Sequence, residues 1–161
     1  MTAAGRTFVD TNVLLYAHDA SETEKQPIAR ALLEELWADR SGVLSSQVLQ
    51  EFYVVATRKF HPPMRRSEAR ELIALYATWP VVQVDVGLIV DATTLEERVK
   101  LSFWDALIVE AARRAGAVRL VSEDLQDGRL IAGVAIENPF AAIRQAEPAR
   151  RGQSLAERSL P

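Results

Sequence analysis

Short runs of apolar residues alternate along the chain with longer segments in which apolar side chains recur at helical spacing. The short runs are rich in β-branched residues, as buried strands are, and they fall at Thr7–Val9, Val43–Leu44, Val81–Val84, Val118–Val121 and Val134–Ile136. Helical spacing occupies the segments Val13–Ala17, Pro27–Ala38, Gln47–Lys59, Ser67–Ala77, Val86–Val99 and Phe103–Ala115. Apolar strands that alternate with helices predict a parallel sheet covered on both faces. We therefore expect a three-layer α/β fold with five parallel strands.

Residues at the predicted helix ends agree with this interpretation. Asp85 precedes one helix in the position of an N-cap, and Gly116 follows another as a stop. From Ala141 the pattern decays into Ala, Arg, Glu and Gln. We therefore expect one domain over residues 1–140 and a flexible C-terminal tail over residues 141–161.

The composition is that of one ordinary globular domain, with 161 residues of which 48% are hydrophobic and 25% are charged. No apolar run approaches the ~20 residues of a membrane span, and no secretory signal is visible at the start, so we expect a cytoplasmic protein without a membrane partner. The chain has no cysteine and only two isolated histidines, His18 and His61. Thiolate chemistry and Cys- or His-rich zinc sites are thereby excluded, and any metal would be held by oxygen.

The formal net charge of −3 provides no overall basic field for nucleic acid. A local basic patch is conceivable at Arg58, Lys59, Arg65 and Arg66, which flank His61, although a solvated loop explains this segment equally well. Trp104 has the spacing of a core residue, and we therefore expect no aromatic platform for stacking bases.

Two carboxylates follow predicted strands directly. Asp10 ends the first strand and Asp124 follows the strand Val118–Val121. In a parallel sheet, chemistry gathers beyond the carboxyl ends of the strands, which is where both side chains would lie. Each residue also has an ordinary structural explanation: Asp10 as a helix cap and Asp124 as a turn residue.

Two further carboxylates lie on predicted helices. Asp105 falls within the apolar arc of its helix, where an ionised group needs a hydrogen bond, an ion pair or a metal. The alternative is a capping box in which Ser102 is the N-cap. Glu51 lies at the margin of the apolar arc of its own helix, where it could be solvated or could pair with Arg58.

Four carboxylates in one crevice would repel one another unless a cation neutralised them. Mg²⁺ or Mn²⁺ takes carboxylate and water oxygens, and such ions can activate a water and stabilise the oxygens of a phosphodiester under attack. The sequence therefore indicates metal-assisted phosphodiester hydrolysis without a histidine or cysteine nucleophile.

Four segments carry a resemblance to a known family. Phe8–Tyr16, Ser45–Tyr53, Leu101–Ile108 and Ser122–Gly128 resemble, in this order, the four acidic motifs of PIN-domain ribonucleases, and most closely those of VapC-type toxins. One departure is Ser122, where many relatives carry threonine. The resemblance implies a PIN-like fold with a five-stranded parallel sheet, RNA as the substrate of a divalent-metal-dependent cleavage, and neutralisation by a cognate antitoxin.

The same resemblance assigns roles to individual residues. The catalytic and metal-binding set would be Asp10, Glu51, Asp105 and Asp124, with Mg²⁺ or Mn²⁺ as the cofactor, and the polar neighbours that bind substrate would be Thr11, Asn12 and Ser122. Asp127 would either share the work of Asp124 or cap its turn. A homodimer is also expected, because small α/β domains often pair through outward-facing helices.

Two other classes of protein share part of this pattern. A phosphoacceptor receiver domain, with Asp85 as acceptor, needs paired carboxylates after the first strand and a lysine after the fifth, and the sequence has neither. The remaining alternative is a catalytically weak PIN-fold module that binds RNA or protein.

Overall fold

The computed structural model describes residues 5–143. Its elements, in chain order, are β1 (Arg6–Val9), α1 (Thr11–His18), α2 (Lys25–Asp39), β2 (Gly42–Ser45), α3 (Ser46–Lys59), α4 (Arg66–Tyr76), β3 (Val81–Val82), α5 (Val86–Val99), α6 (Phe103–Arg114), β4 (Ala117–Val121), β5 (Leu130–Ile131) and β6 (Val134–Glu137). The alternation of strands and helices is the one that the sequence predicts.

The strands form one sheet in the order β3-β2-β1-β4-β6-β5. Phe8 of β1 lies between Val43 of β2 and Leu120 of β4, and both pairings are parallel. The α/β class and the five parallel strands are confirmed, but the sheet has six strands because β5 adds an antiparallel edge to β6. The sequence pattern missed β5 because two residues are too few to show a period.

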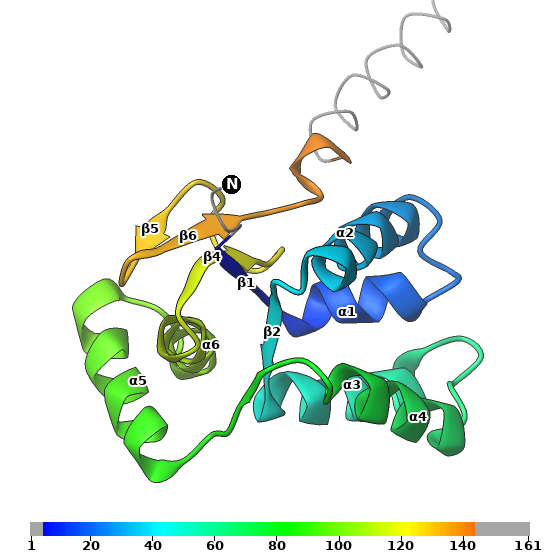
Figure 1. Cartoon of the computed structure of the whole chain (residues 1–161), viewed down its shortest axis with the longest axis horizontal. Coiled ribbons are helices and arrows are strands. Elements are labelled where there is room, and N and C mark those ends of the chain that lie inside the picture. Colours follow the sequence, from blue (N-terminus) through cyan, green and yellow to red (C-terminus); the bar gives the residue numbers. More distant parts are fainter. Residues whose placement is uncertain (1–4, 144–161) are drawn as a thin grey trace, which may run out of the picture.

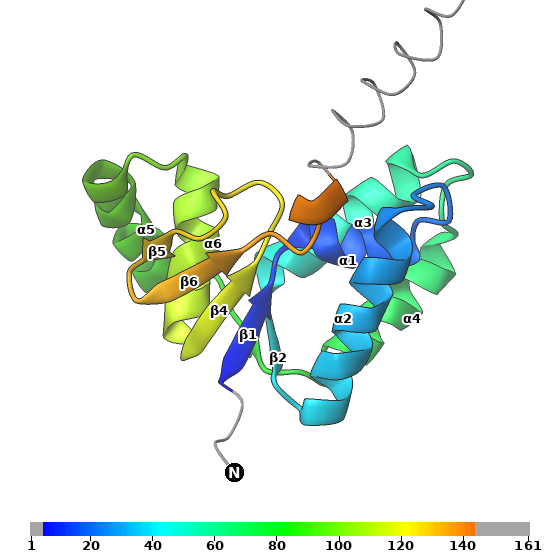
Figure 2. The ribbon, with the colours of Figure 1, turned by 90° about the horizontal axis from the view of Figure 1, so that it is seen from above.

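Helices cover both faces of the sheet. Figures 1 and 2 show α5 and α6 on one side and α1 to α4 on the other. The largest fully buried side chains include Phe8, Phe52, Leu120 and Phe140, which lie in a single core. Of the predicted C-terminal tail, residues 144–161 lie outside the described residues, and Ile143 still packs against the core. No helix between residues 5 and 143 is long and apolar enough to cross a membrane.

Helix α6 differs from its predicted pattern at two positions. Trp104, expected in the core, is 63% exposed, because the buried part of α6 begins only at Ala106. Glu110, whose charge would favour the polar face of the helix, is buried, and Arg113 donates a hydrogen bond of 2.7 Å to its carboxylate. The spacing on a helix gives the direction of a side chain but not how far the neighbouring elements extend over it.

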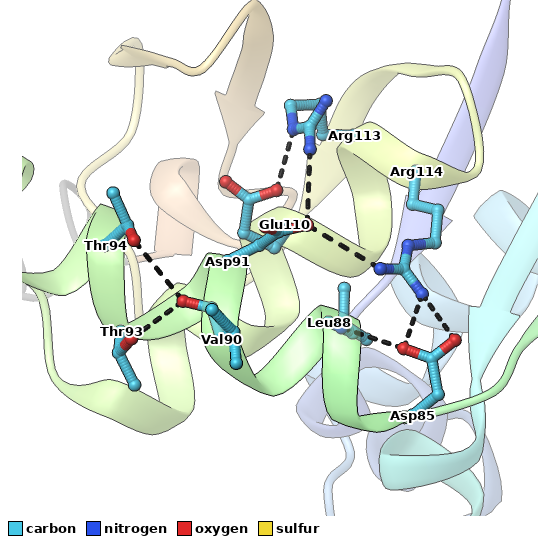
Figure 3. A network of polar contacts seen from close by, with 9 residues as sticks. All are labelled: Asp85, Leu88, Val90, Asp91, Thr93, Thr94, Glu110, Arg113 and Arg114. Atoms are coloured by element: carbon cyan, nitrogen blue, oxygen red, sulfur yellow. Dashed lines mark hydrogen bonds and ion pairs between the residues drawn. The ribbon is translucent and has the colours of Figure 1, made fainter.

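Charged side chains join α5 to α6 on the surface of the molecule (Figure 3). Asp85 caps α5 as predicted, accepting the Leu88 N–H at 2.8 Å, and its two oxygens also accept hydrogen bonds of 2.8 Å from Arg114. Asp91 lies 3.6 Å from Arg114. Asp85 therefore serves structure, in agreement with the rejection of a receiver domain. The predicted helix stop is also confirmed, since Gly116 follows α6 with a φ of +69°.

Candidate active site

The ends of two central strands bring Asp10 and Ser122 together. Asp10 follows β1, and its backbone N–H donates to the carbonyl of Val121, the last residue of β4, at 3.0 Å. Its carboxylate accepts the Thr11 N–H at 2.7 Å, so Asp10 caps α1 as one interpretation predicted. Because β1 and β4 are parallel neighbours, Ser122 at the end of β4 lies beside Asp10.

A hydrogen-bonded cluster extends from Asp10 to Asp124. The Asp10 carboxylate accepts bonds from Ser122 Oγ at 2.7 Å and from Asn12 Nδ2 at 3.4 Å. The same Asn12 amide donates to Asp124 Oδ2 at 3.1 Å, and the Asp124 N–H donates to Ser122 Oγ at 3.1 Å. Asn12 therefore bridges the two carboxylates.

Glu51 joins this cluster through Thr11. Helix α3 begins directly after β2, which places Glu51 in its second turn near the same edge of the sheet. Thr11 Oγ1 donates to Glu51 at 2.7 Å, and Gln47 Nε2 donates to it at 2.9 Å. These two residues, and not Arg58, bind the Glu51 carboxylate. Gln47 Oε1 is buried without a hydrogen-bond partner.

Burial governs the electrostatics of the cluster. Asp10 is only 6% exposed, and desolvation raises the pKa of its carboxyl group to about 6. The hydrogen bonds from Ser122 and Thr11 oppose this rise in pKa, whereas the negative charges of Asp124 and Glu51 add to it. The Asp10 carboxylate is thus fixed in position by hydrogen bonds, but these bonds compensate only part of the cost of its negative charge.

Asp105 lies in the first turn of α6. Because α6 leads directly into β4, its first turn is at the carboxyl edge of the sheet, the same edge as Asp10. The Asp105 N–H donates to Ser102 Oγ at 3.1 Å, the contact expected of a capping interaction. Within residues 5–143, its half-buried carboxylate makes no hydrogen bond or ion pair, and no three acidic or histidine side chains lie close enough together to hold a metal.

A cavity of about 410 Å³ opens beside the cluster. It is lined by Thr11, Asn12, Glu51 and Asp124 together with apolar side chains of α1 and α3. A second cavity of about 350 Å³, between α3 and α4, shares Gln50 and Val54 with the first and has an apolar lining. Acidic and apolar surfaces therefore adjoin one another.

Comparison with protein families gives one decisive match. The model of the family described as PIN domain matches residues 7–127, which is most of the chain and includes Asp10, Glu51, Asp105 and Asp124. The chain belongs to the PIN-domain family. The comparison with curated proteins found no match.

Solved structures similar to this PIN domain include toxins of toxin–antitoxin systems. VapC20 from Mycobacterium tuberculosis, described as a toxin that cleaves the sarcin–ricin loop, is 24% identical with a TM-score of 0.56, covering 71% of this chain and 86% of that one. A toxin–antitoxin complex from Klebsiella pneumoniae contains a chain 18% identical with a TM-score of 0.62, covering 83% and 98%. A chain of FitAB bound to a DNA fragment is 16% identical with a TM-score of 0.63, covering 83% and 95%. At these identities the likeness shows the fold.

The structure adds residues to the PIN-domain site that the sequence analysis missed. Glu123, between Ser122 and Asp124, pairs with Lys25 of α2 at 2.7 Å and accepts a hydrogen bond from the Tyr16 hydroxyl group. No local pattern could have indicated a partner that is 98 residues away. Asp127 accepts the Asn138 N–H at 2.8 Å, a bond that ties its turn to the segment after β6.

Proposed function

We propose that this PIN domain is an endoribonuclease that depends on Mg²⁺ or Mn²⁺ and acts as the toxin of a toxin–antitoxin pair. The observation that carries the proposal is the cluster in which Asn12 bridges Asp10 and Asp124 while Thr11 holds Glu51. Acidic groups from three separate segments are linked there through Asn12 and Thr11, beside an open cavity. Membership of a family whose members are typically ribonucleases supports the same function.

The donor atoms of the cluster fit a hard divalent cation. They are carboxylate oxygens with hydroxyl groups beside them, and there is no sulfur or imidazole among them. Mg²⁺ keeps several of its waters and is commonly bound by only one or two carboxylates together with substrate phosphate, so a ready-made cage of three acids is not required. We propose that Asp10 and Asp124 bind the ion directly and that Glu51 and Asp105 complete the site.

Each residue of the cluster would then have a distinct role. A bound divalent ion supplies an acidified water and positive charge at the scissile phosphate. Asp10 is held rigid by Ser122, which is fully buried and therefore serves as a positioning residue. Thr11 orients Glu51, which lines the cavity and would accept a proton from the attacking water. Asn12 would keep Asp10 and Asp124 within reach of one ion, and it lines the cavity in which the RNA backbone would bind.

The two adjoining cavities support the proposed antitoxin partner. An apolar segment seated on Leu49, Tyr53 and Ile73 would run toward Glu51 and Asp124. An Arg or Lys at the end of that segment would pair with the carboxylates and block the site. The complexes from Klebsiella pneumoniae and of FitAB supply the precedent for the class of partner. The homodimer stays a prediction.

The nuclease function is tested with Asp10→Asn on purified protein and total RNA, with and without Mg²⁺. The amide keeps the shape and the capping bond but removes the charge, so cleavage should fall at least 100-fold while the fold persists. Asp39→Asn, at the exposed end of α2, is the matched control and should cleave as the wild type does. Cleavage by Asp10→Asn at the wild-type rate would refute the proposed site.

One observation favours the alternative of a binding module. No three acidic side chains lie together between residues 5 and 143, as a weak or inactive site would also show. Binding of RNA by the wild type with no new RNA ends in either Mg²⁺ or Mn²⁺ would establish this second function.

The toxin role has its own test in cells. Expression of the wild-type chain alone should arrest growth, and Asp105→Ala should not. Normal growth with abundant wild-type protein would leave a nuclease without a toxin role.

A further inference from the structure

Lys25, the first residue of α2, reaches across the molecule to the segment that carries Asp124. Its ammonium group lies 2.7 Å from Glu123 Oε1 and 3.2 Å from the Tyr16 hydroxyl oxygen. The ammonium is also 4.4 Å from the centre of the Tyr16 ring. The Glu123 side chain is only 10% exposed, so this contact is an ion pair largely removed from water.

Glu123 is held from two directions. Its side chain is bound by Lys25 and Tyr16, while its backbone N–H donates to Asn12 Oδ1 at 3.2 Å. The adjacent Asp124 N–H donates to Ser122 Oγ. Residues 122–124 are thus bonded to the acidic cluster on one side and to the first residue of α2 on the other.

The far end of the same loop is fixed separately. Asp127 accepts the Asn138 N–H, and the Gly128 N–H donates to the Ile136 carbonyl at 2.9 Å. These contacts come from β6 and the residues after it, whereas the contact with Lys25 is among those that fix the end nearer to Asp124. The contact of Lys25 and Tyr16 with Glu123 is the anchor of this loop. Phe140 packs against the anchor, because its ring meets the Tyr16 ring edge-on at 5.1 Å.

We propose that Lys25 is a positioning residue that sets the place of Asp124 in the cation site through Glu123. The inference rests on the proposed function for the identity of the ion. Without its ammonium partner, the Glu123 carboxylate would turn toward water to regain solvation. Because the two residues are adjacent in the chain, that movement would draw Asp124 away from Asn12 and Asp10.

The test replaces Lys25 by methionine, which keeps an unbranched chain of similar length and removes the charge. Two measurements are made: amide hydrogen exchange at Glu123 and Asp124, and Mn²⁺ affinity by electron paramagnetic resonance. We expect exchange at both amides to rise at least tenfold and Mn²⁺ affinity to fall at least tenfold. Arg114→Met, which removes an ion pair of 2.8 Å to Asp85 on the other side of the sheet, is the matched control and should change neither.

A set of further variants separates positioning from general destabilisation. Lys25→Arg should restore both measurements to within about threefold of the wild type. Adding Glu123→Gln to Lys25→Met should recover part of the amide protection, since the neutral amide no longer needs a cation. If Lys25→Met does not fold, Tyr16→Phe loosens the same anchor and should raise exchange at Asp124.

The outcomes are distinguishable. Mn²⁺ affinity within twofold of the wild type in folded Lys25→Met, with both amides still protected, would overturn the positioning role. Faster exchange without a change in Mn²⁺ affinity would also overturn it, because the loop would then be loosened without consequence for the ion. A wild type that binds Mn²⁺ but cleaves no RNA would refute the nuclease and leave the positioning role standing.

Discussion

Asp10 is a residue at which burial in the fold opposes the ionisation of a side chain. It is buried as a core residue would be, yet it is polar, caps a helix and faces two other acids. Ser122 and Thr11 relieve only part of the cost of burying its charge. A buried carboxylate that its surroundings do not neutralise is the kind of group expected at a functional site.

The raised pKa of Asp10 has a definite sign in stability. The folded protein binds this proton with a pKa of about 6, against 3.8 for the ordinary carboxyl group, so the free energy of unfolding should fall as pH rises from about 4 to about 6. The expected loss is about 3 kcal/mol. Asp10→Asn should remove this slope and stabilise the metal-free protein at pH 7, measured by urea denaturation between pH 4 and 7.

Asp85→Asn provides a control for the Asp10 experiment. Arg114 lowers the pKa of Asp85, so the ionised Asp85 carboxylate stabilises the folded protein at pH 7, and Asp85→Asn should reduce stability there, the opposite of the effect of Asp10→Asn. A metal-free Asp10→Asn protein less stable than the wild type at pH 7 would show that the charge at Asp10 is well compensated, contrary to this view.

Trp104 and Trp79 form a second contrast between single residues. Trp104 is 63% exposed, so Trp104→Ala should change the free energy of unfolding by only about 0.5 kcal/mol. Trp79 is 7% exposed and packs edge-on against Trp37 at 4.9 Å, and Trp79→Ala should cost about 3–5 kcal/mol. Equal losses in chemical denaturation would mean that Trp104 is covered in solution.

Among the elements, the strands and helices could be predicted from the sequence. How far each element is buried by its neighbours could not. The alternation of apolar runs predicts β1 and β4, and a strand end followed by an acid predicts Asp10 and Asp124 at one edge. The pattern misplaces Trp104, because it cannot show that the first turn of α6 extends beyond its neighbours. The pattern also cannot predict the ion pair between Lys25 and Glu123, because that contact depends on where α2 starts relative to the end of β4.

The end of α1 is tied to α4 by a buried histidine. His18 is hydrogen-bonded to the Tyr76 hydroxyl group at 2.8 Å, and burial lowers the pKa of its imidazole to about 4 from 6.5. In the unfolded chain, the His18 imidazole therefore binds a proton below about pH 6.5, whereas in the folded protein it binds that proton only below about pH 4. The free energy of unfolding should fall as pH is lowered through this window, by less than about 3 kcal/mol because water reaches part of the ring.

The His18 effect is measured most clearly without the opposing slope of Asp10. In an Asp10→Asn background, His18→Gln should abolish the remaining loss of stability between pH 6.5 and 4, since glutamine keeps a polar group near Tyr76 and does not titrate. An unchanged acid slope would assign the loss to other groups.

For the whole molecule, the proposed cation links the site to global stability. An ion that binds only the folded protein stabilises it by about 2.7 kcal/mol at a concentration of 100 times its Kd. For a domain of this size, that corresponds to a rise in Tm of roughly 5–10 °C. Thermal unfolding with Mn²⁺ should show this rise in the wild type and in Asp39→Asn, and Asp10→Asn should lose most of it. A wild type indifferent to millimolar Mn²⁺ would contradict direct coordination by Asp10.

The bond between Ser122 and Asp10 joins residues that are 112 positions apart. A ribosome adding roughly 5–20 residues per second needs roughly 6–22 seconds to travel that distance. During this interval Asp10 is already made, but the serine that will orient it does not yet exist. Under the proposed toxin function, the chain would therefore be inactive for most of its own synthesis, and the proposed antitoxin would have that time to be made. Nascent chains arrested before Ser122 should cleave no RNA, and cleavage by such chains would contradict this timing.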